Sequence, residues 1–159
     1  MGSFEQSSTL NLPQPYLLFL GEETQDRNAK TAFGLRDWAR DQCVGEWSMP
    51  AATVTTGLPR VAPALAYSRG ARSLVIGIAV SGGQIPSTWI PTLTESLEAG
   101  LDLISGMHTR LQEVPQLAEL AARDTALTRD AKIAAGSYWA SILAKPPRRP
   151  GSRERPRSR

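Results

Sequence analysis

The sequence predicts an α/β fold in which helices flank a mostly parallel sheet. Two uninterrupted apolar runs, YLLFL at 16–20 and SLVIGIAV at 73–80, are typical of strands that are covered on both faces. Segments with apolar residues at helical spacing follow the strand-like runs, and this alternation occurs four times. Such alternation favours a layered sheet with right-handed crossovers, whose ligands collect at the carboxyl ends of the strands.

Two strands and one long helix are expected in the first fifty residues. Residues 16–20 are aromatic and aliphatic up to Gly21, which is the pattern of a short buried strand. Residues 26–40 carry apolar side chains at helical spacing, so a helix there packs against the sheet. The residues at this spacing are Ala32, Leu35 and Ala39. Residues 43–49 are predicted to form the second strand.

A loop and a short helix then lead to the central strand. Residues 50–59 begin and end with proline and are predicted to form the loop. The helix is expected at 61–69, with Pro63 in its first turn and Gly70 at its end. Because 73–80 is β-branched and aliphatic without interruption, it is predicted to be the central strand.

The second half of the chain repeats the alternation. Ser87 or Thr88 is expected to cap a helix that ends at Gly100. A strand at 101–105 precedes another helix, which Pro115 opens. The inward-facing residues of the two helices are Ile90, Leu93 and Leu97, and Leu117, Leu120 and Ala121.

One globular domain is the expected organisation. A chain of 159 residues is long enough for one core and too short for a second full domain. Its longest apolar runs are far shorter than the roughly 20 residues of a membrane-spanning helix, and its start lacks the features of a secretory signal. Cys43 is the only cysteine, so no internal disulfide can form. We therefore expect a cytoplasmic protein without a membrane partner.

The positive charge is concentrated at the C-terminus. The formal net charge is +3, but residues 145–159 hold seven basic residues against Glu154, while the first 144 residues hold 11 basic and 14 acidic ones. This tail lacks apolar periodicity and is predicted to be disordered. A solvated end is favoured over an arm that adapts to polyanions, and no specific nucleic-acid partner is expected.

The stretch GIAVSGGQ at 77–84 keeps the two glycines of a P-loop, GxxxxGK[ST], without the charged half of that motif. Gly83 stands where the motif has lysine, and Gln84 stands where it has a hydroxyl for magnesium. A nucleoside triphosphate would therefore meet no charge here. A tight turn between a strand and a helix is the favoured interpretation, and binding of an anion by the backbone N–H groups is the alternative.

A second polar loop, SGMHTRL at 105–111, follows the strand at 101–105. Because parallel strands end at one edge of a sheet, this loop and the glycine loop are expected to be neighbours. His108, the only histidine, could bind a ligand or move a proton there, although a surface or structural histidine is the favoured alternative. A nucleophilic pair of Cys43 and His108 is the least favoured reading, because Cys43 lies in a strand-like segment. No metal cluster can be assembled from these residues.

Four segments of the chain carry a family resemblance: PYLLFLGEETQDRNAKTAFGLRDW, CVGEW, GARSLVIGIAVSGGQIPSTWIPTLTESLEAGLDLISGMHTRL and PQLAELAAR. Together they resemble the N-terminal Rossmann-like domain of the D-glutamate N-acetyltransferase-like family. The likeness covers residues 15–123, and its most specific part is the order of the two loops in GGQIPSTWIPTLTESLEAGLDLISGMH. It implies a Rossmann-like fold and assigns no catalytic residue to this half. The ligand contacts that it implies are Gly82, Gly83, Ser105, Gly106 and His108.

The resemblance implies transfer of an acetyl group from acetyl-CoA to the amino group of D-glutamate, with a second, P-loop-containing domain taking part. No GxxxxGK[ST] occurs in the sequence, and residues 124–144 depart from the family pattern and are predicted to be a divergent helical segment. Residues 1–14 are expected to be a flexible N-terminus. A truncated or frameshifted form of a longer protein is favoured over a true short variant.

Two functions remain open from the sequence. The favoured one is the N-terminal domain of an acetyltransferase-like enzyme, which is inactive alone, needs no cofactor by itself and has the C-terminal P-loop domain as its partner. The alternative is a non-enzymatic binding or oligomerisation module, in which an exposed sheet surface meets another protomer and forms a homo-oligomer.

Overall fold

Five parallel strands form the sheet of the computed structural model, which describes residues 12–123 and 128–130. The strands are β1 (Tyr16–Phe19), β2 (Cys43–Trp47), β3 (Ser73–Ile76), β4 (Asp102–Ser105) and β5 (Thr128–Asp130). They lie in the order β2-β1-β3-β4-β5, and every neighbouring pair is parallel, so β3 is central as predicted. The strand order reverses between β1 and β3, which creates the kind of switch point at which doubly wound sheets bind ligands.

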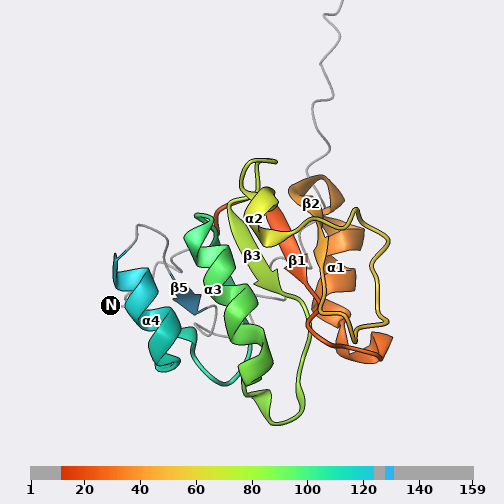
Figure 1. Cartoon of the computed structure of the whole chain (residues 1–159). Helices are drawn as coiled ribbons and strands as arrows, with labels where there is room; N and C mark the ends of the chain where they lie inside the picture. The colour runs from red at the N-terminus through yellow and green to blue at the C-terminus, as the bar shows by residue number, and fades with distance from the viewer. Residues whose placement is uncertain (1–11, 124–127, 131–159) are drawn as a thin grey trace, which may run out of the picture.

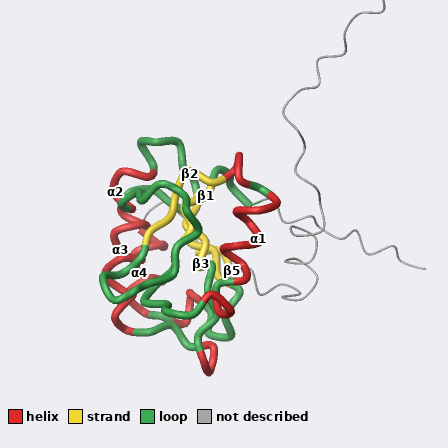
Figure 2. The backbone as a smooth tube through the Cα atoms, turned by 90° about the vertical axis from the view of Figure 1, so that its right-hand side faces the viewer, coloured by secondary structure: helices red, strands yellow, loops and turns green. Residues whose placement is uncertain are grey.

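Helices cover both faces of this sheet. The α-helices are α1 (Lys30–Trp38), α2 (Pro63–Ala66), α3 (Ile90–Glu98) and α4 (Pro115–Arg123). Figure 1 shows α2 and α3 in front of the strands, and Figure 2 shows α1 alone on one side of the sheet, with α2, α3 and α4 on the other. Short 3₁₀ turns lie at Asp26–Asn28, Arg40–Gln42, Ser81–Gly83, Ser87–Trp89 and Leu111–Glu113. The predicted α/β class is confirmed.

Contacts that are distant in sequence shorten two of the predicted elements. The strand expected at 73–80 ends at Ile76. The N–H of Gly77 still donates to the carbonyl of Phe19 in β1, but the chain then bonds the segment at the start of α1. The N–H of Ala32 donates to the carbonyl of Gly77 at 3.0 Å, and the N–H of Ala79 donates to the carbonyl of Asn28 at 2.8 Å. The helix expected at 26–40 is divided at Ala29, whose φ of −102° and ψ of 26° lie outside the helical region.

The cap predicted at Ser87 or Thr88 is wrong. Neither hydroxyl accepts a hydrogen bond at the start of α3, where a 3₁₀ turn leads directly into the helix. The Thr88 hydroxyl donates instead to the carboxylate of Glu22 at 3.3 Å. Pro91 lies in the first turn of α3, where a missing N–H costs nothing.

The domain begins earlier than residue 15. Leu12 is 3% exposed and belongs to the core, and the carbonyl of Pro13 accepts a hydrogen bond from the Ser73 hydroxyl at 2.7 Å. The prediction of a flexible segment is therefore wrong for residues 12–14. The prediction of a helical segment at 124–144 is wrong for Thr128–Asp130, which forms β5. The predictions for residues 1–11, for the rest of 124–144 and for the tail at 145–159 lie outside the described residues.

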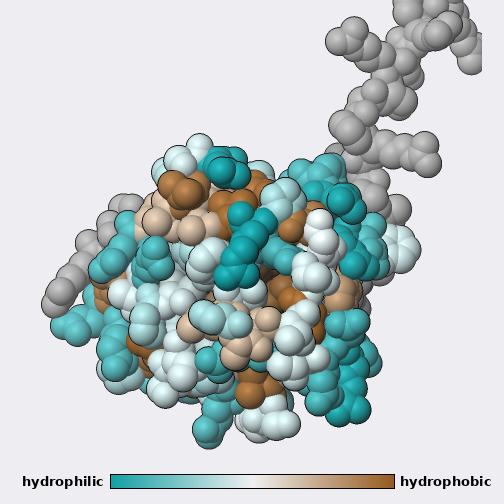
Figure 3. All heavy atoms as spheres, turned by 45° about the vertical axis from the view of Figure 1, so that its right-hand side comes forward, coloured by the Kyte–Doolittle hydropathy of each residue, from teal (hydrophilic) through white to brown (hydrophobic). Residues whose placement is uncertain are grey.

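Large apolar side chains are sparse on the described surface. The exposed ones are Trp38, Leu65 and Tyr67. On the face drawn in Figure 3, apolar atoms form small patches that polar side chains separate. The Arg72 guanidinium lies over the ring of Tyr67 at 4.4 Å, which covers part of that ring. Within the described segments, every helix is too short or too polar to cross a bilayer.

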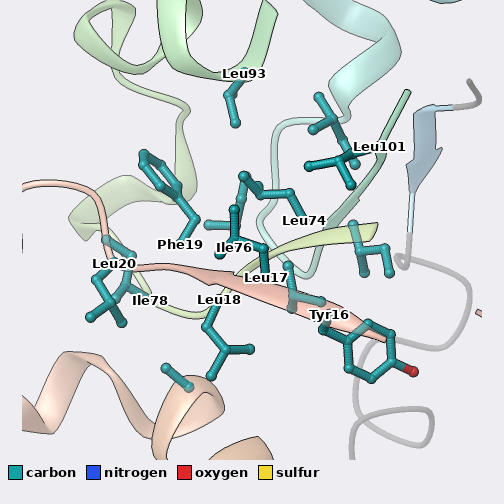
Figure 4. Close-up of a cluster of buried hydrophobic side chains, with 14 of the residues drawn as sticks. Tyr16, Leu17, Leu18, Phe19, Leu20, Leu74, Ile76, Ile78, Leu93 and Leu101 are labelled. Atoms are coloured by element: carbon teal, nitrogen blue, oxygen red, sulfur yellow. The ribbon is translucent and has the colours of Figure 1, made fainter. Parts of the chain in front are cut away.

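The core occupies both faces of β1 and β3, which are two of the three inner strands. In Figure 4, Phe19 points toward the α3 residue Leu93, while Leu18 points to the opposite face, where α1 lies. Phe19 also meets the ring of Trp89 edge to face, with the ring centroids 5.2 Å apart. All four residues of β3 are buried, as the uninterrupted apolar run predicts. Burial of each large apolar side chain contributes about 1.5–3 kcal/mol, and this fixes the strand ends that carry the loops described next.

Candidate functional site

A hollow of about 200 Å³ lies at the carboxyl edge of the sheet, next to the switch point. Its walls come from the first turn of α1, from the chain that follows β3 and from the loop that follows β4. We call it the edge hollow. Its lining residues are Thr31, Ile76, Ile78, Ala79, Val80, Gly83, Gly106, Met107 and His108. Three elements far apart in sequence thus meet at the place where the strand order predicts a ligand.

The glycine loop and the SGMHTRL loop meet directly, as predicted. The N–H of Thr109 donates to the carbonyl of Gly83 at 3.0 Å. A Cβ atom placed on Gly83 would lie 2.4 Å from the Cδ2 atom of His108, so His108 would have to shift to make room for any side chain there. Gly83 also has a φ of +66°, a conformation that favours glycine. Both reasons therefore favour glycine at this position.

The glycine loop forms a tight turn between β3 and α3, which agrees with the favoured reading of GIAVSGGQ. Residues Ser81–Gly83 make a 3₁₀ turn in which Gly82 has a φ of +81°. The N–H of Gly83 donates to the carbonyl of Val80 at 2.9 Å, so the turn uses that donor internally. Gly82 is exposed, and a Cβ on it would meet no atom within 4 Å. Gly82 therefore shapes the turn and does not line the edge hollow.

The loop after β4 presents one imidazole to the edge hollow. Ser105 is 2% exposed, and its hydroxyl accepts the N–H of Met107 at 3.1 Å, so this serine holds the turn together. Gly106 and His108 are exposed and line the hollow, and Met107 is 6% exposed and forms part of its floor. Of the five residues predicted to contact a ligand, the structure places Gly83, Gly106 and His108 at the hollow.

The first turn of α1 differs from a dinucleotide-binding turn. In such turns a pyrophosphate sits against the N-terminus of the first helix. Here the chain at 77–79 bonds that turn, and a Cβ on Gly77 would lie 2.6 Å from the Cβ of Ala32. The connection from β1 to α1 also carries Glu22, Glu23 and Asp26, whose carboxylates would repel a phosphate. The edge hollow is therefore suited to a ligand other than a dinucleotide.

Cys43 and His108 lie apart. Cys43 begins β2, at the amino edge of the sheet, whereas His108 follows β4 at the carboxyl edge. The Cys43 thiol donates to the carbonyl of Ala39 at 3.5 Å. Burial, with a smaller contribution from the Asp41 carboxylate, raises the pKa of the Cys43 thiol to about 12. A thiol of this kind is protonated at neutral pH, so the pair is not a nucleophilic dyad.

The remaining lining residues differ in how far the sequence could have identified them. Ile76, Ile78, Ala79 and Val80 lie at the end of a strand-like run, and the carboxyl-edge rule could have identified them as neighbours of a ligand. Thr31 had no such signal, because only the fold brings the first turn of α1 beside the end of β3.

Known proteins resemble this chain in sequence and in fold. Residues 41–132 match a family model described as "Domain of unknown function (DUF1611_N) Rossmann-like domain". A protein named D-glutamate N-acetyltransferase from Tritonibacter scottomollicae is 40% identical over 124 residues, which are 78% of this chain and 37% of that protein. Another of the same name, from Pseudoalteromonas sp, is 38% identical over 111 residues, which are 70% of this chain and 33% of that protein.

A solved structure agrees with this likeness. The crystal structure of a DUF1611 family protein from Anabaena variabilis matches with a TM-score of 0.55 and 31% sequence identity, over 68% of this chain and 34% of that chain. The chain thus spans about a third of the length of the curated relatives it matches. The family match also continues past residue 123, where the resemblance was expected to end.

Proposed function

Since the chain belongs to the DUF1611_N family of Rossmann-like domains, we propose that it is the N-terminal domain of a D-glutamate N-acetyltransferase-like protein. The observation that supports this most is the 40% and 38% identity to two relatives that carry the name D-glutamate N-acetyltransferase. The family match at 41–132 includes both loops of the edge hollow. The proposal places the protein in the cytoplasm, where the free thiol of Cys43 stays reduced.

In this proposal the substrate pocket lies between two domains, and the edge hollow is the part of the pocket that this domain forms. Gly83, Gly106 and His108 contact the ligand, while Gly82 and Ser105 set the shapes of the two loops. Acetyl-CoA would supply an activated thioester. The amino nitrogen forms a C–N bond as the C–S bond breaks, and the ammonium group loses two protons, one to the departing thiolate and one to solvent. In the proposal, His108 accepts the second of these protons and passes it to solvent.

Acetyl transfer in this proposal also requires a C-terminal P-loop domain. The chain matches 37% and 33% of the two named relatives, so most of each relative has no counterpart in these 159 residues. We therefore propose that the chain alone is inactive and is a truncated or frameshifted form of a longer protein. Sequencing the DNA downstream tests the second part: another frame that encodes GxxxxGK[ST] supports it, and its absence contradicts it.

Reconstitution tests the function itself. The C-terminal domain of a relative is added in trans, or the reading frame is restored, and acetyl-CoA-dependent acetylation of D-glutamate is measured by product formation. Activity is expected only in the complete system. The same complete system with His108→Gln provides the matched comparison, because the variant keeps a polar side chain and loses the proton acceptor. Absence of acetylation across D- and L-amino acids in the complete system would reject the function.

The second candidate is a non-enzymatic binding or oligomerisation module. It is supported by Leu65 in α2 and by Tyr67 directly after α2, which are 53% and 44% exposed. The described surface has only these two and Trp38 as exposed large apolar side chains, so the enzyme domain is favoured. Light scattering separates the two candidates, since a stable dimer or complex supports the module and a monomer contradicts it.

A further inference from the structure

We propose that the edge hollow binds the uncharged acyl-thioester end of the acetyl donor, and that the carboxylates of the amino-acid acceptor are held outside it. This inference rests on the proposed function. It assigns one of the two substrates to this domain, and it follows from the chemistry of the residues that form the walls.

The walls of the hollow combine apolar and polar surface. Five of the nine lining residues are aliphatic or thioether side chains and two are glycines, and no lysine, arginine, aspartate or glutamate belongs to the lining that the described residues form. D-glutamate brings two carboxylates and an ammonium group. Among the described lining residues, no side-chain cation is available to pair with a carboxylate. A neutral thioester needs no such partner, so the lining favours the donor over the acceptor.

The polar groups present match a single carbonyl. Thr31 and His108 are the two polar side chains of the lining, and both can donate one hydrogen bond to an acceptor. A thioester offers one carbonyl oxygen between apolar groups, and a pocket with apolar walls and a few placed donors is the usual form for such a ligand.

The size of the hollow fits one end of a ligand. Its volume of about 200 Å³ is smaller than the roughly 300–1,000 Å³ of pockets that enclose whole cofactors or drug-sized molecules. The rest of the donor would therefore extend over the rim toward the portion of the protein that the chain does not contain.

Two side chains of the hollow serve as reporters in a binding experiment on the 159-residue chain. His108 is the only histidine and Met107 is one of three methionines, so each gives a resolvable NMR signal after one assignment variant. The probe is the short neutral thioester S-acetyl-N-acetylcysteamine, and the comparison is D-glutamate at tenfold higher concentration and the same pH. The thioester is expected to shift both signals saturably, and D-glutamate is expected to leave both unchanged.

Two exposed alanines provide matched variants. Ala79 lines the hollow, whereas Ala64 is exposed on α2, away from it. Ala79→Lys is expected to weaken thioester binding at least tenfold and to create a measurable response to D-glutamate, because it adds a cation to the rim. Ala64→Lys is expected to behave like the parent chain. Both positions are exposed, so neither lysine has to be buried.

The outcomes separate this inference from the proposed function. Saturable shifts with D-glutamate and none with the thioester would overturn the inference and leave the acetyltransferase function standing. An absence of response to both probes would overturn it too. The proposed function is tested only by the reconstituted acetylation assay. A failed binding experiment therefore rejects the assignment of the donor to the hollow, whereas a failed assay rejects the function.

Discussion

The imidazole of His108 lies against the backbone of Gly83 so closely that it fills the space where a side chain on Gly83 would begin. The neighbouring Thr109 N–H donates to the Gly83 carbonyl. These contacts join the loop after β3 to the loop after β4 and place the imidazole at the rim of the edge hollow. The position of His108 is therefore set by a glycine 25 residues earlier in the chain.

Gly83→Ala is expected to lower the free energy of unfolding by about 2–4 kcal/mol. The left-handed φ of +66° costs roughly 1 kcal/mol for alanine, and the methyl group adds overlap with His108 worth about 1–3 kcal/mol. Gly57→Ala is the matched control, because Gly57 has a φ of +78° and a Cβ there meets no atom within 4 Å. Urea denaturation of both variants measures the difference.

A double-mutant cycle shows whether His108 causes that difference. In a His108→Ala background, Gly83→Ala is expected to cost less than in the parent chain, since the overlap with the ring atoms is gone and only the contact with the Cβ of residue 108 at 2.9 Å remains. An undiminished cost in that background would show that the imidazole is not the obstacle.

Glu46→Gln is expected to destabilise the fold by about 1–3 kcal/mol. The Glu46 carboxylate is 7% exposed and accepts hydrogen bonds from the Thr55 hydroxyl at 2.5 Å, from the Thr56 N–H at 2.6 Å and from the Thr56 hydroxyl. An amide replaces one acceptor oxygen with a donor, so a buried partner loses its bond. Thermal or urea unfolding measures the loss.

The control for that change is Glu22→Gln. Glu22 is exposed and accepts one hydrogen bond, from the Thr88 hydroxyl at 3.3 Å, so its substitution is expected to stay within about 0.5 kcal/mol of the parent. Equal effects at both positions would mean that the buried carboxylate does not hold the loop at 50–58.

The stability that Cys43 contributes is expected to fall at alkaline pH. Burial raises the pKa of its thiol to about 12, whereas an unfolded cysteine titrates near pH ~8.5. Between these values the native state keeps a proton that the unfolded state has lost, so stability decreases as pH rises. The contribution is fully present below about pH 8.5, and its slope above that reaches at most about 1.4 kcal/mol per pH unit.

Comparison with Cys43→Ala isolates this effect. The difference in unfolding free energy between the parent and the variant is measured from pH 7 to about pH 10.5, which cancels the titration of groups that both proteins share. A difference that is constant over this range would contradict the buried, protonated thiol. We also expect Cys43 to react with iodoacetamide at pH 8 more slowly in the folded chain than in the urea-unfolded chain.

Gly77→Ala is expected to destabilise the fold by about 1–3 kcal/mol. The added methyl group would lie 2.6 Å from the Cβ and 3.0 Å from the Cα of Ala32, where the chain leaving β3 crosses the first turn of α1. Ala32→Gly in the same chain is expected to recover part of the loss, because it removes the facing methyl group. Additive costs of the two substitutions, measured by urea denaturation, would argue against this contact.

Much of the fold was predictable because it depends on local apolar patterns. The uninterrupted run that contains Leu74, Val75 and Ile76 requires cover on both faces, and this identified the central strand. The meeting of the two loops at the edge hollow followed from the rule that parallel strands end at one edge. Gly83 and His108 could therefore be chosen before their contact was known.

The rest depends on contacts between distant segments, which a local pattern does not contain. Beyond the end of β3 at Ile76, the course of the chain is set by hydrogen bonds to Asn28 and Ala32, which lie in other elements. The burial of Leu12 depends on the start of β3, where the Ser73 hydroxyl donates to the adjacent Pro13 carbonyl. Thr31 lines the edge hollow because hydrogen bonds between distant segments hold the first turn of α1 beside the end of β3.

The main-chain bonds from Thr109 to Gly83, from Ala32 to Gly77 and from Ala79 to Asn28 connect all three walls of the edge hollow to one another. The cavity is consequently preorganised, and a ligand entering it pays little entropy for ordering its surroundings. Association at this site should then proceed at the speed of diffusive encounter, with differences in affinity among ligands expressed in their residence times.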